Sequence, residues 1–217
     1  MKIKHLAAGA GVVGLVLAAG PAFATGNSYT VAVGGSSTAG TAAVTATSDA
    51  ALEFYAEKPD GTFLKLTCAS SAVPSGSGSV VNKGTGITDV ANLQGVTFST
   101  CSGPGGTLNV TTSGTWKLHG TSTATSTASD TIQGHIENVT ANASNAVCSF
   151  TVTGGADGSF SESTQKLSVN EQANGVGQAL TVSGVSGCLG QIKNNGKAKF
   201  IGTYTTSVTG GSVNLLP

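Results

Sequence analysis

The sequence predicts an all-β protein, an antiparallel β-sandwich preceded by an N-terminal signal peptide helix. The 217 residues include 32 Gly, and only 9% of them are charged. Thr and Val, which favour strands, recur in short runs separated by Gly, Pro, Asn and Asp, which favour turns. Beyond the first 24 residues, no apolar pattern keeps a helical period over about ten residues. These observations favour strands throughout the remaining chain.

The first 24 residues have the three parts of a cleavable secretory signal. Residues 1–5 are basic, residues 6–19 are apolar, and Ala22-Phe23-Ala24 places small residues where signal peptidase cleaves. The apolar run of about 14 residues is shorter than the about 20 that a membrane-spanning helix needs. We therefore expect cleavage after Ala24 and a secreted, extracellular or cell-surface location for residues 25–217.

Strand-like segments then follow one another to residue 207. Pro59 and Gly61 predict a hairpin turn at residues 58–61, because Pro presets φ at the second turn position and Gly closes the turn. Asn195-Gly196 predicts another hairpin turn. The expected loops and turns are residues 70–79, 101–106, 121–130 and 154–158. The expected strands are residues 41–47, 54–57, 62–66, 90–100, 108–112, 115–120, 132–139, 146–153, 160–169, 179–183 and 197–207.

The expected mature chain contains four cysteines, Cys68, Cys101, Cys148 and Cys188. An even number of cysteines in an exported chain predicts two disulfides, and their number alone leaves three pairings open. The absence of a CxxC pair and of a His-rich partner set argues against zinc.

A faint internal repeat bears on the pairing. Cys101 is followed by Gly114-Thr115-Trp116, and Cys188 is followed at nearly the same distance by Gly202-Thr203-Tyr204. This predicts two related halves, residues 27–120 and 128–217. It favours one disulfide in each half, Cys68–Cys101 and Cys148–Cys188. The sequence leaves open whether the halves share one sandwich or form two modules.

Charge excludes one class of partner. Lys2 and Lys4 leave with the signal, so eight lysines face ten acidic residues, and the chain contains no arginine. Nucleic-acid binding needs clustered cations, usually including arginine, to contact phosphates. We therefore expect no nucleic-acid partner.

No constellation of residues predicts catalysis. His119 and His135 are the only histidines after the signal, and the sequence contains no Gly-x-Ser-x-Gly motif. In the strand at 115–120, Trp116 and Leu118 should face one way and Lys117 and His119 the other. Asp157 is interpreted as a turn residue rather than a calcium ligand. We therefore predict no catalytic residue, no metal and no cofactor.

Aromatic side chains are the only candidates for a binding surface. Trp116, Tyr204 and Tyr55, together with Tyr29, are the residues whose rings could stack on a sugar. The favoured alternative for Trp116 is a core position between packed sheets.

The Ala/Gly/Val-rich signal, the Gly/Thr/Ser-rich strands and the segment 93–101 (LQGVTFSTC) with Gly114-Thr115-Trp116 after it resemble small secreted bacterial β-rich proteins. The layout is also similar to PraB-type activators of alkane oxidation. That similarity implies action outside the cell on apolar substrates and carries over no functional residue.

We therefore expect a non-catalytic secreted or cell-surface β-protein that acts by binding or as an extracellular structural component. A carbohydrate-binding module and a secreted hydrolase with scattered active-site residues are the alternatives. The candidate partners are cell-envelope or extracellular polysaccharide, an apolar substrate, and further copies of the chain.

Overall fold

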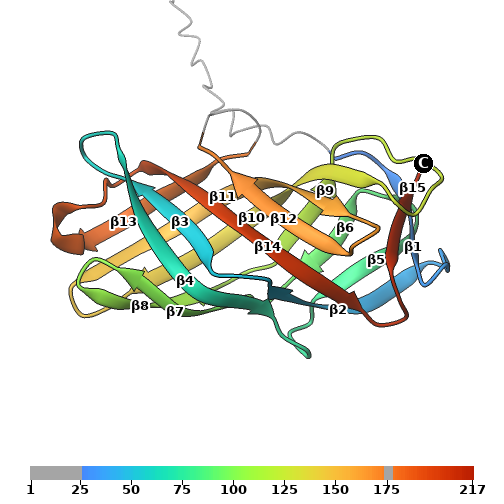
Figure 1. Cartoon of the computed structure of the whole chain (residues 1–217), viewed down its shortest axis with the longest axis horizontal. Helices are drawn as coiled ribbons and strands as arrows, with labels where there is room; N and C mark the ends of the chain where they lie inside the picture. Colours follow the sequence, from blue (N-terminus) through green and yellow to red (C-terminus); the bar gives the residue numbers. More distant parts are fainter. Residues whose placement is uncertain (1–25, 174–177) are drawn as a thin grey trace, which may run out of the picture.

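A computed structural model describes residues 26–173 and 178–217, so the predicted signal peptide lies outside the described residues. The described chain consists of antiparallel strands and one short 3-10 helix, η1 (Cys188–Gly190), which confirms the all-β antiparallel class (Figure 1). The strands are β1 (Tyr29–Val33), β2 (Gly40–Ser48), β3 (Leu52–Glu57), β4 (Phe63–Val73), β5 (Val80–Ile87), β6 (Asp89–Leu93), β7 (Thr97–Gly103), β8 (Gly106–Thr112), β9 (Trp116–Gly120), β10 (Thr131–Ser144), β11 (Cys148–Ser161), β12 (Lys166–Glu171), β13 (Leu180–Gly187), β14 (Gly196–Val208) and β15 (Val213–Leu216).

The strands join into one sheet that closes on itself twice. One closed ring runs β10–β11–β12–β14–β2–β5–β6–β9 and returns to β10. The other runs β10–β11–β13–β14–β3–β4–β7–β8 and again returns to β10. We call these the terminal ring and the disulfide ring. Together they form one elongated cylinder, with the terminal ring and β1 and β15 toward the right of Figure 1 and the disulfide ring toward the left.

Three long strands hold the two rings together. β10 and β11 have 14 residues each and β14 has 13, and all three pair with strands of both rings. Opposing walls of the cylinder pack face to face across the core, as the layers of the predicted sandwich would. Within the two rings every strand pairs on both sides, so the rings have no free sheet edge, whereas β15 pairs only with β1.

The predicted halves do not form separate modules. Strand β10 of the second half pairs with β8 and β9 of the first, and β14 of the second half pairs with β2 and β3. Residues 27–120 and 128–217 therefore share one core. Whether the two halves are related by duplication stays a prediction.

Most predicted strands match the structure, but the predicted strand 160–169 is interrupted at residues 162–165, and the expected interruptions at 70–79, 101–106 and 154–158 are partly or wholly strand. The predicted hairpin at residues 58–61 is present, with Gly61 N–H donating to Lys58 O at 2.9 Å. Residues 154–158 are not a turn but the middle of β11, and residues 70–73 continue β4. The segment 90–100 is two strands, β6 and β7, divided near Gly95, whose φ is +60°. β1, β5 and β15 had no sequence prediction.

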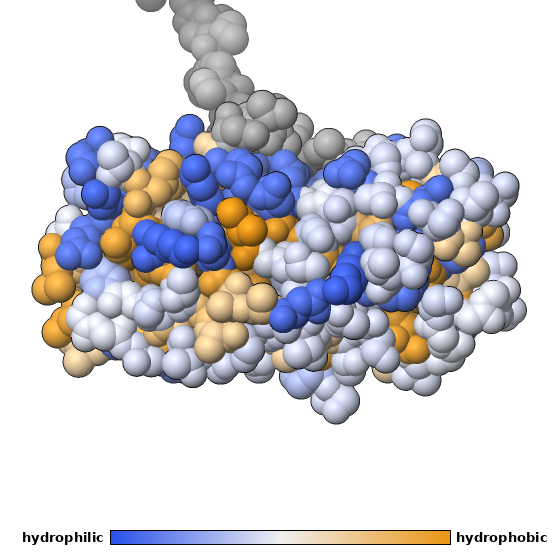
Figure 2. Space-filling model, in the orientation of Figure 1, coloured by the Kyte–Doolittle hydropathy of each residue, from blue (hydrophilic) through white to orange (hydrophobic). Residues whose placement is uncertain are grey.

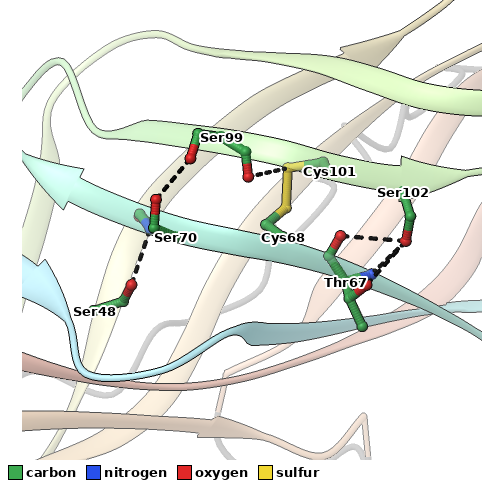
Figure 3. The surroundings of a disulfide bond; sticks show 8 residues. Ser48, Thr67, Cys68, Ser70, Ser99, Cys101 and Ser102 are labelled. Atoms are coloured by element: carbon green, nitrogen blue, oxygen red, sulfur yellow. Dashed lines mark hydrogen bonds between the residues drawn. A yellow bond between two sulfur atoms is a disulfide. The ribbon is translucent and has the colours of Figure 1, made fainter.

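The two predicted disulfides, Cys68–Cys101 and Cys148–Cys188, are both present, and the described residues contain no free cysteine. Cys68 and Cys101 are direct cross-strand neighbours on β4 and β7, between the hydrogen-bonded pairs Ser70–Ser99 and Thr67–Ser102 (Figure 3). Two disulfides fit an oxidising environment.

The outer surface is mixed. Figure 2 shows a face on which hydrophilic and intermediate residues surround separate small hydrophobic patches. Among the described residues, Val147 and Leu189 are the only exposed large hydrophobic side chains, at 46% and 66% exposure. In the part of the chain that the structure covers, no helix is long and apolar enough to cross a membrane.

Candidate functional site

Strand alternation separates an apolar interior from a polar outer face. Along β9, Trp116 and Leu118 line the interior, while Lys117 and His119 both reach the carboxylate of Asp89. The predicted alternation of these four side chains is confirmed. The same period-2 pattern acts on the other strands, and it fills the cylinder with Val, Ala, Leu and Phe.

The interior is not completely filled. A cavity of about 90 Å³ lies in the terminal ring, and a second cavity of about 120 Å³ lies in the disulfide ring. Both are lined almost wholly by apolar side chains. The two cavities share the lining residues Ala46, Leu93, Ile136, Leu167 and Val169, so they adjoin near the middle of the cylinder. We call the two cavities together the lumen.

Aromatic rings form much of the wall of the larger cavity. Phe98 and Phe200 meet edge to face with ring centroids 6.2 Å apart, and Phe54 stacks with Phe150 at the same separation. Phe54, Phe98 and Phe200 line this cavity and still keep accessible surface. Side chains that face unfilled space behave in this way, because no neighbouring atoms cover them.

The predicted sugar-stacking residues are not assembled as a surface platform. Trp116 is 8% exposed and Tyr204 is 6% exposed, and both line the larger cavity. Burial raises the pKa of Tyr204 to about 12. Both residues occupy inward-facing strand positions, so neither ring can be offered to a polysaccharide.

The other two tyrosines are held by local contacts. Tyr55 is half-buried, and its hydroxyl donates to Glu53 at 2.6 Å. Tyr29 is buried, and its hydroxyl donates to Ser122 O. Because Trp116, Tyr204 and Tyr29 are buried, the four rings form no common exposed face, and a carbohydrate-binding role stays a prediction.

The outer face carries a row of ionisable side chains that the sequence did not reveal. Register pairs Asp89 of β6 with His119 of β9, His119 with His135 of β10, and His135 with Asp157 of β11. Cross-strand neighbours lie about 5 Å apart at Cβ, so these four residues form one continuous line across four strands. Glu137 lies two residues after His135 and so shares its face.

His119, His135 and Glu137 converge at the centre of this row. Glu137 Oε1 lies 3.1 Å from His135 Nε2, and Glu137 Oε2 lies 3.2 Å from His119 Nε2. The centroids of the two imidazole rings are 5.2 Å apart. The ligand-type atoms of all three residues lie within 4.8 Å of one another. We call these three residues the histidine cluster.

The histidine cluster is sheltered although it lies on the outer face. The side chains of His135, His119 and Glu137 are 3%, 10% and 16% exposed. Gly26 lies against His119, where an added Cβ would stand 2.9 Å from the His119 Cβ. A polar pocket begins on the other side, lined by His135, Asp157 and other polar residues, among them Ser159 and Gln178.

His135 hydrogen-bonds Glu137 through Nε2, and among residues 26–173 and 178–217 no serine hydroxyl hydrogen-bonds either imidazole. A hydrolase site assembled from scattered residues stays a prediction. Asp157 is not a turn residue, as predicted, but a strand residue whose Oδ1 accepts the Gln178 N–H at 3.2 Å.

Two buried carboxyls tie strand ends together elsewhere in the terminal ring. Glu162 accepts the backbone N–H groups of Leu215 and Asp130, and Glu171 accepts those of Asp157 and Ala173. Burial raises the pKa of both carboxyls above the usual 4.5. These contacts give Glu162 and Glu171 a structural role.

Comparison of the chain with protein-family models, with curated proteins and with solved structures found no match. The function proposed below therefore depends on the sequence and on the geometry of the structure.

Proposed function

We propose that the chain is an exported, non-catalytic binding protein that holds a small apolar molecule in its lumen at the cell exterior. The observation that carries this proposal is the pair of adjoining apolar cavities inside a closed cylinder. Export is inferred from the signal-like residues 1–24 and fits the two disulfides. The similarity to PraB-type proteins, which implies apolar substrates, points the same way.

An unfilled apolar cavity is expensive for a folded chain. At about 24 cal/mol per Å³, the 120 Å³ cavity costs about 3 kcal/mol relative to a filled core. Bulkier side chains that filled the cavity would recover this free energy. A bound apolar molecule recovers it as well, because it restores dispersion contacts without requiring hydrogen bonds.

Size and chemistry define the ligand class. Dry apolar cavities of about 150 Å³ accept benzene or xenon, and the larger cavity approaches that size. Its lining offers aromatic rings and aliphatic side chains, and almost no polar group that could fix a polar ligand. We therefore expect small hydrocarbons to bind and polar molecules of the same shape to be rejected.

The test is thermal unfolding of the mature chain with and without benzene, with pyridine as the polar counterpart. Ligand that binds only the folded state raises Tm by linkage. Benzene should raise Tm in a saturable manner, and pyridine at the same concentration should not. Equal responses to both compounds, or no response to either, would refute the proposal.

Two matched variants locate the effect. Ala141 lines the larger cavity on β10, and Ala43 is exposed on β2. Ala141→Leu adds its side-chain atoms inside the cavity and should abolish the benzene shift. Ala43→Leu adds the same atoms outside and should leave the shift unchanged. A benzene shift that survives Ala141→Leu would place the binding elsewhere.

A further inference from the structure

The histidine cluster has the composition and spacing of a metal site. Two imidazole nitrogens and one carboxylate form a common set of protein ligands for a zinc ion that keeps its fourth position open. With zinc–ligand bonds of 2.0–2.2 Å in a tetrahedron, ligand atoms lie about 3.3 Å apart. The two N···O separations, 3.1 Å from His135 Nε2 to Glu137 Oε1 and 3.2 Å from His119 Nε2 to Glu137 Oε2, are close to that value.

The hydrogen bonds of His119 leave one ring nitrogen free for a cation. Its Nδ1 lies 3.2 Å from Thr88 O and 3.4 Å from Asp89 Oδ1, and both oxygens only accept hydrogen bonds. Nδ1 therefore donates on that side of the ring, and Nε2 points toward Glu137 Oε2 at 3.2 Å. Nε2 is buried and makes no hydrogen bond. A cation placed between Nε2 and the carboxylate would contact both groups.

The contact of His119 Nδ1 with Thr88 O and Asp89 is the arrangement that supports a metal-bound imidazole. A ligating histidine usually donates its second N–H to a carbonyl or carboxylate, which fixes the tautomer and the direction of the ring. Thr88 O and Asp89 occupy that place for His119. Lys117 in turn holds Asp89 through an ion pair of 2.7 Å.

We propose that His119, His135 and Glu137 bind one Zn²⁺ ion on the outer face of β9 and β10. The ion replaces the hydrogen bond between His135 Nε2 and Glu137 Oε1, and His135 then binds it as a neutral imidazole whose single proton is on Nδ1. The polar pocket of about 690 Å³ that begins at His135 leaves space for water, or for a small polar molecule, at the fourth position. This site is separate from the apolar lumen of the proposed function.

Competing sites for a soft divalent ion are few. After residue 24 the sequence has no histidine other than His119 and His135. The described residues contain no free thiol, because all four cysteines are in disulfides. A site in the mature protein that uses imidazole or thiolate ligands therefore has to involve the histidine cluster.

The test uses the mature chain without a histidine tag, freed of metal with a chelator. Calorimetric titration with Zn²⁺ should show one site per chain, and Co²⁺ in place of zinc should give the visible absorption of a tetrahedral nitrogen–oxygen site. Zn²⁺ should also raise Tm, because the three ligands come together only in the folded chain. No stoichiometric Zn²⁺ binding, together with no Co²⁺ spectrum, would overturn the proposal.

Conservative variants distinguish the cluster from weak surface binding. Glu137→Gln keeps the shape of the side chain and a hydrogen bond to His135. Loss of an outer-shell partner weakens metal binding about 10–100-fold. Loss of the ligand Glu137 should weaken Zn²⁺ binding by at least as much. His119→Gln removes the unpartnered nitrogen and should abolish the Co²⁺ spectrum. The control Glu53→Gln changes a carboxylate that pairs with Lys65 in the disulfide ring, and it should bind Zn²⁺ unchanged. Wild-type affinity in both cluster variants would overturn the proposal.

Discussion

Removing one disulfide at a time tests whether the cylinder is a single cooperative unit. The two bonds join residues 33 and 40 positions apart. In the chain-entropy description, crosslinks that close loops of this size stabilise the folded state by about 4 kcal/mol each at 25 °C. Replacing Cys68 and Cys101 by Ala, or Cys148 and Cys188 by Ala, should therefore lower the free energy of unfolding by about 3–4 kcal/mol in either case.

The shared strands determine how this loss appears. Because β10, β11 and β14 pair with strands of both rings, neither predicted half can unfold and leave the other intact. Trp116, the only Trp in the chain, lies in the first predicted half, whereas the Cys148–Cys188 disulfide lies in the second. Loss of the Cys148–Cys188 disulfide should still lower the guanidinium concentration at which Trp116 fluorescence reports unfolding.

The assay is guanidinium unfolding followed by Trp116 fluorescence and by far-ultraviolet circular dichroism. Both probes should report one coincident transition in the wild type and in each double-Ala variant. The control is the wild type with reductant, which should lose the contribution of both disulfides. A Trp116 transition that does not move when Cys148 and Cys188 are replaced, while the dichroism splits into two steps, would refute the single-core account.

Two further predictions concern buried groups. Because the pKa values of Glu162 and Glu171 are raised in the folded state, the unfolded chain loses these protons first as pH rises above the usual 4.5, and their contribution to stability falls until pH passes the raised values. Glu162→Gln should flatten that decline in denaturant titrations between pH 4 and 7, and an unchanged or steeper decline would contradict this. A Cβ on Gly134 would clash with the backbone oxygen of His119, so Gly134→Ala should cost about 1–3 kcal/mol in thermal unfolding. A change near zero, equal to that of the exposed control Ser144→Ala, would contradict the clash.

Composition and local pattern carried the prediction of the fold class. Thr- and Val-rich runs gave β2, β8, β9 and β14 within a few residues, because strand propensity and alternation are local properties. The glycines at 154–158 predicted a turn, and this prediction was wrong, because the segment lies within β11. Gly155 and Gly158 lie inside β11, where a Cβ would clash with Gln178 and with the Ser168 backbone, so they serve close strand approach.

The lumen and the histidine cluster depend on pairing that no local pattern specifies. His119 and His135 are ordinary strand residues in the sequence, and only the register of β9 on β10 makes them neighbours. The same holds for the closure of the sheet, which follows from pairs such as β12–β14 and β2–β5. The disulfide pairing could be predicted from the sequence, because the faint repeat placed one cysteine pair in each half.

The proposed apolar lumen is tested most directly by nuclear Overhauser contacts from bound benzene to the isotopically labelled mature chain. The account predicts contacts to Trp116, Phe98 and Phe200, which line the larger cavity. These contacts should be lost in Ala141→Leu. Contacts confined to the exposed side chains Val147 and Leu189 would show surface adsorption and would contradict the account.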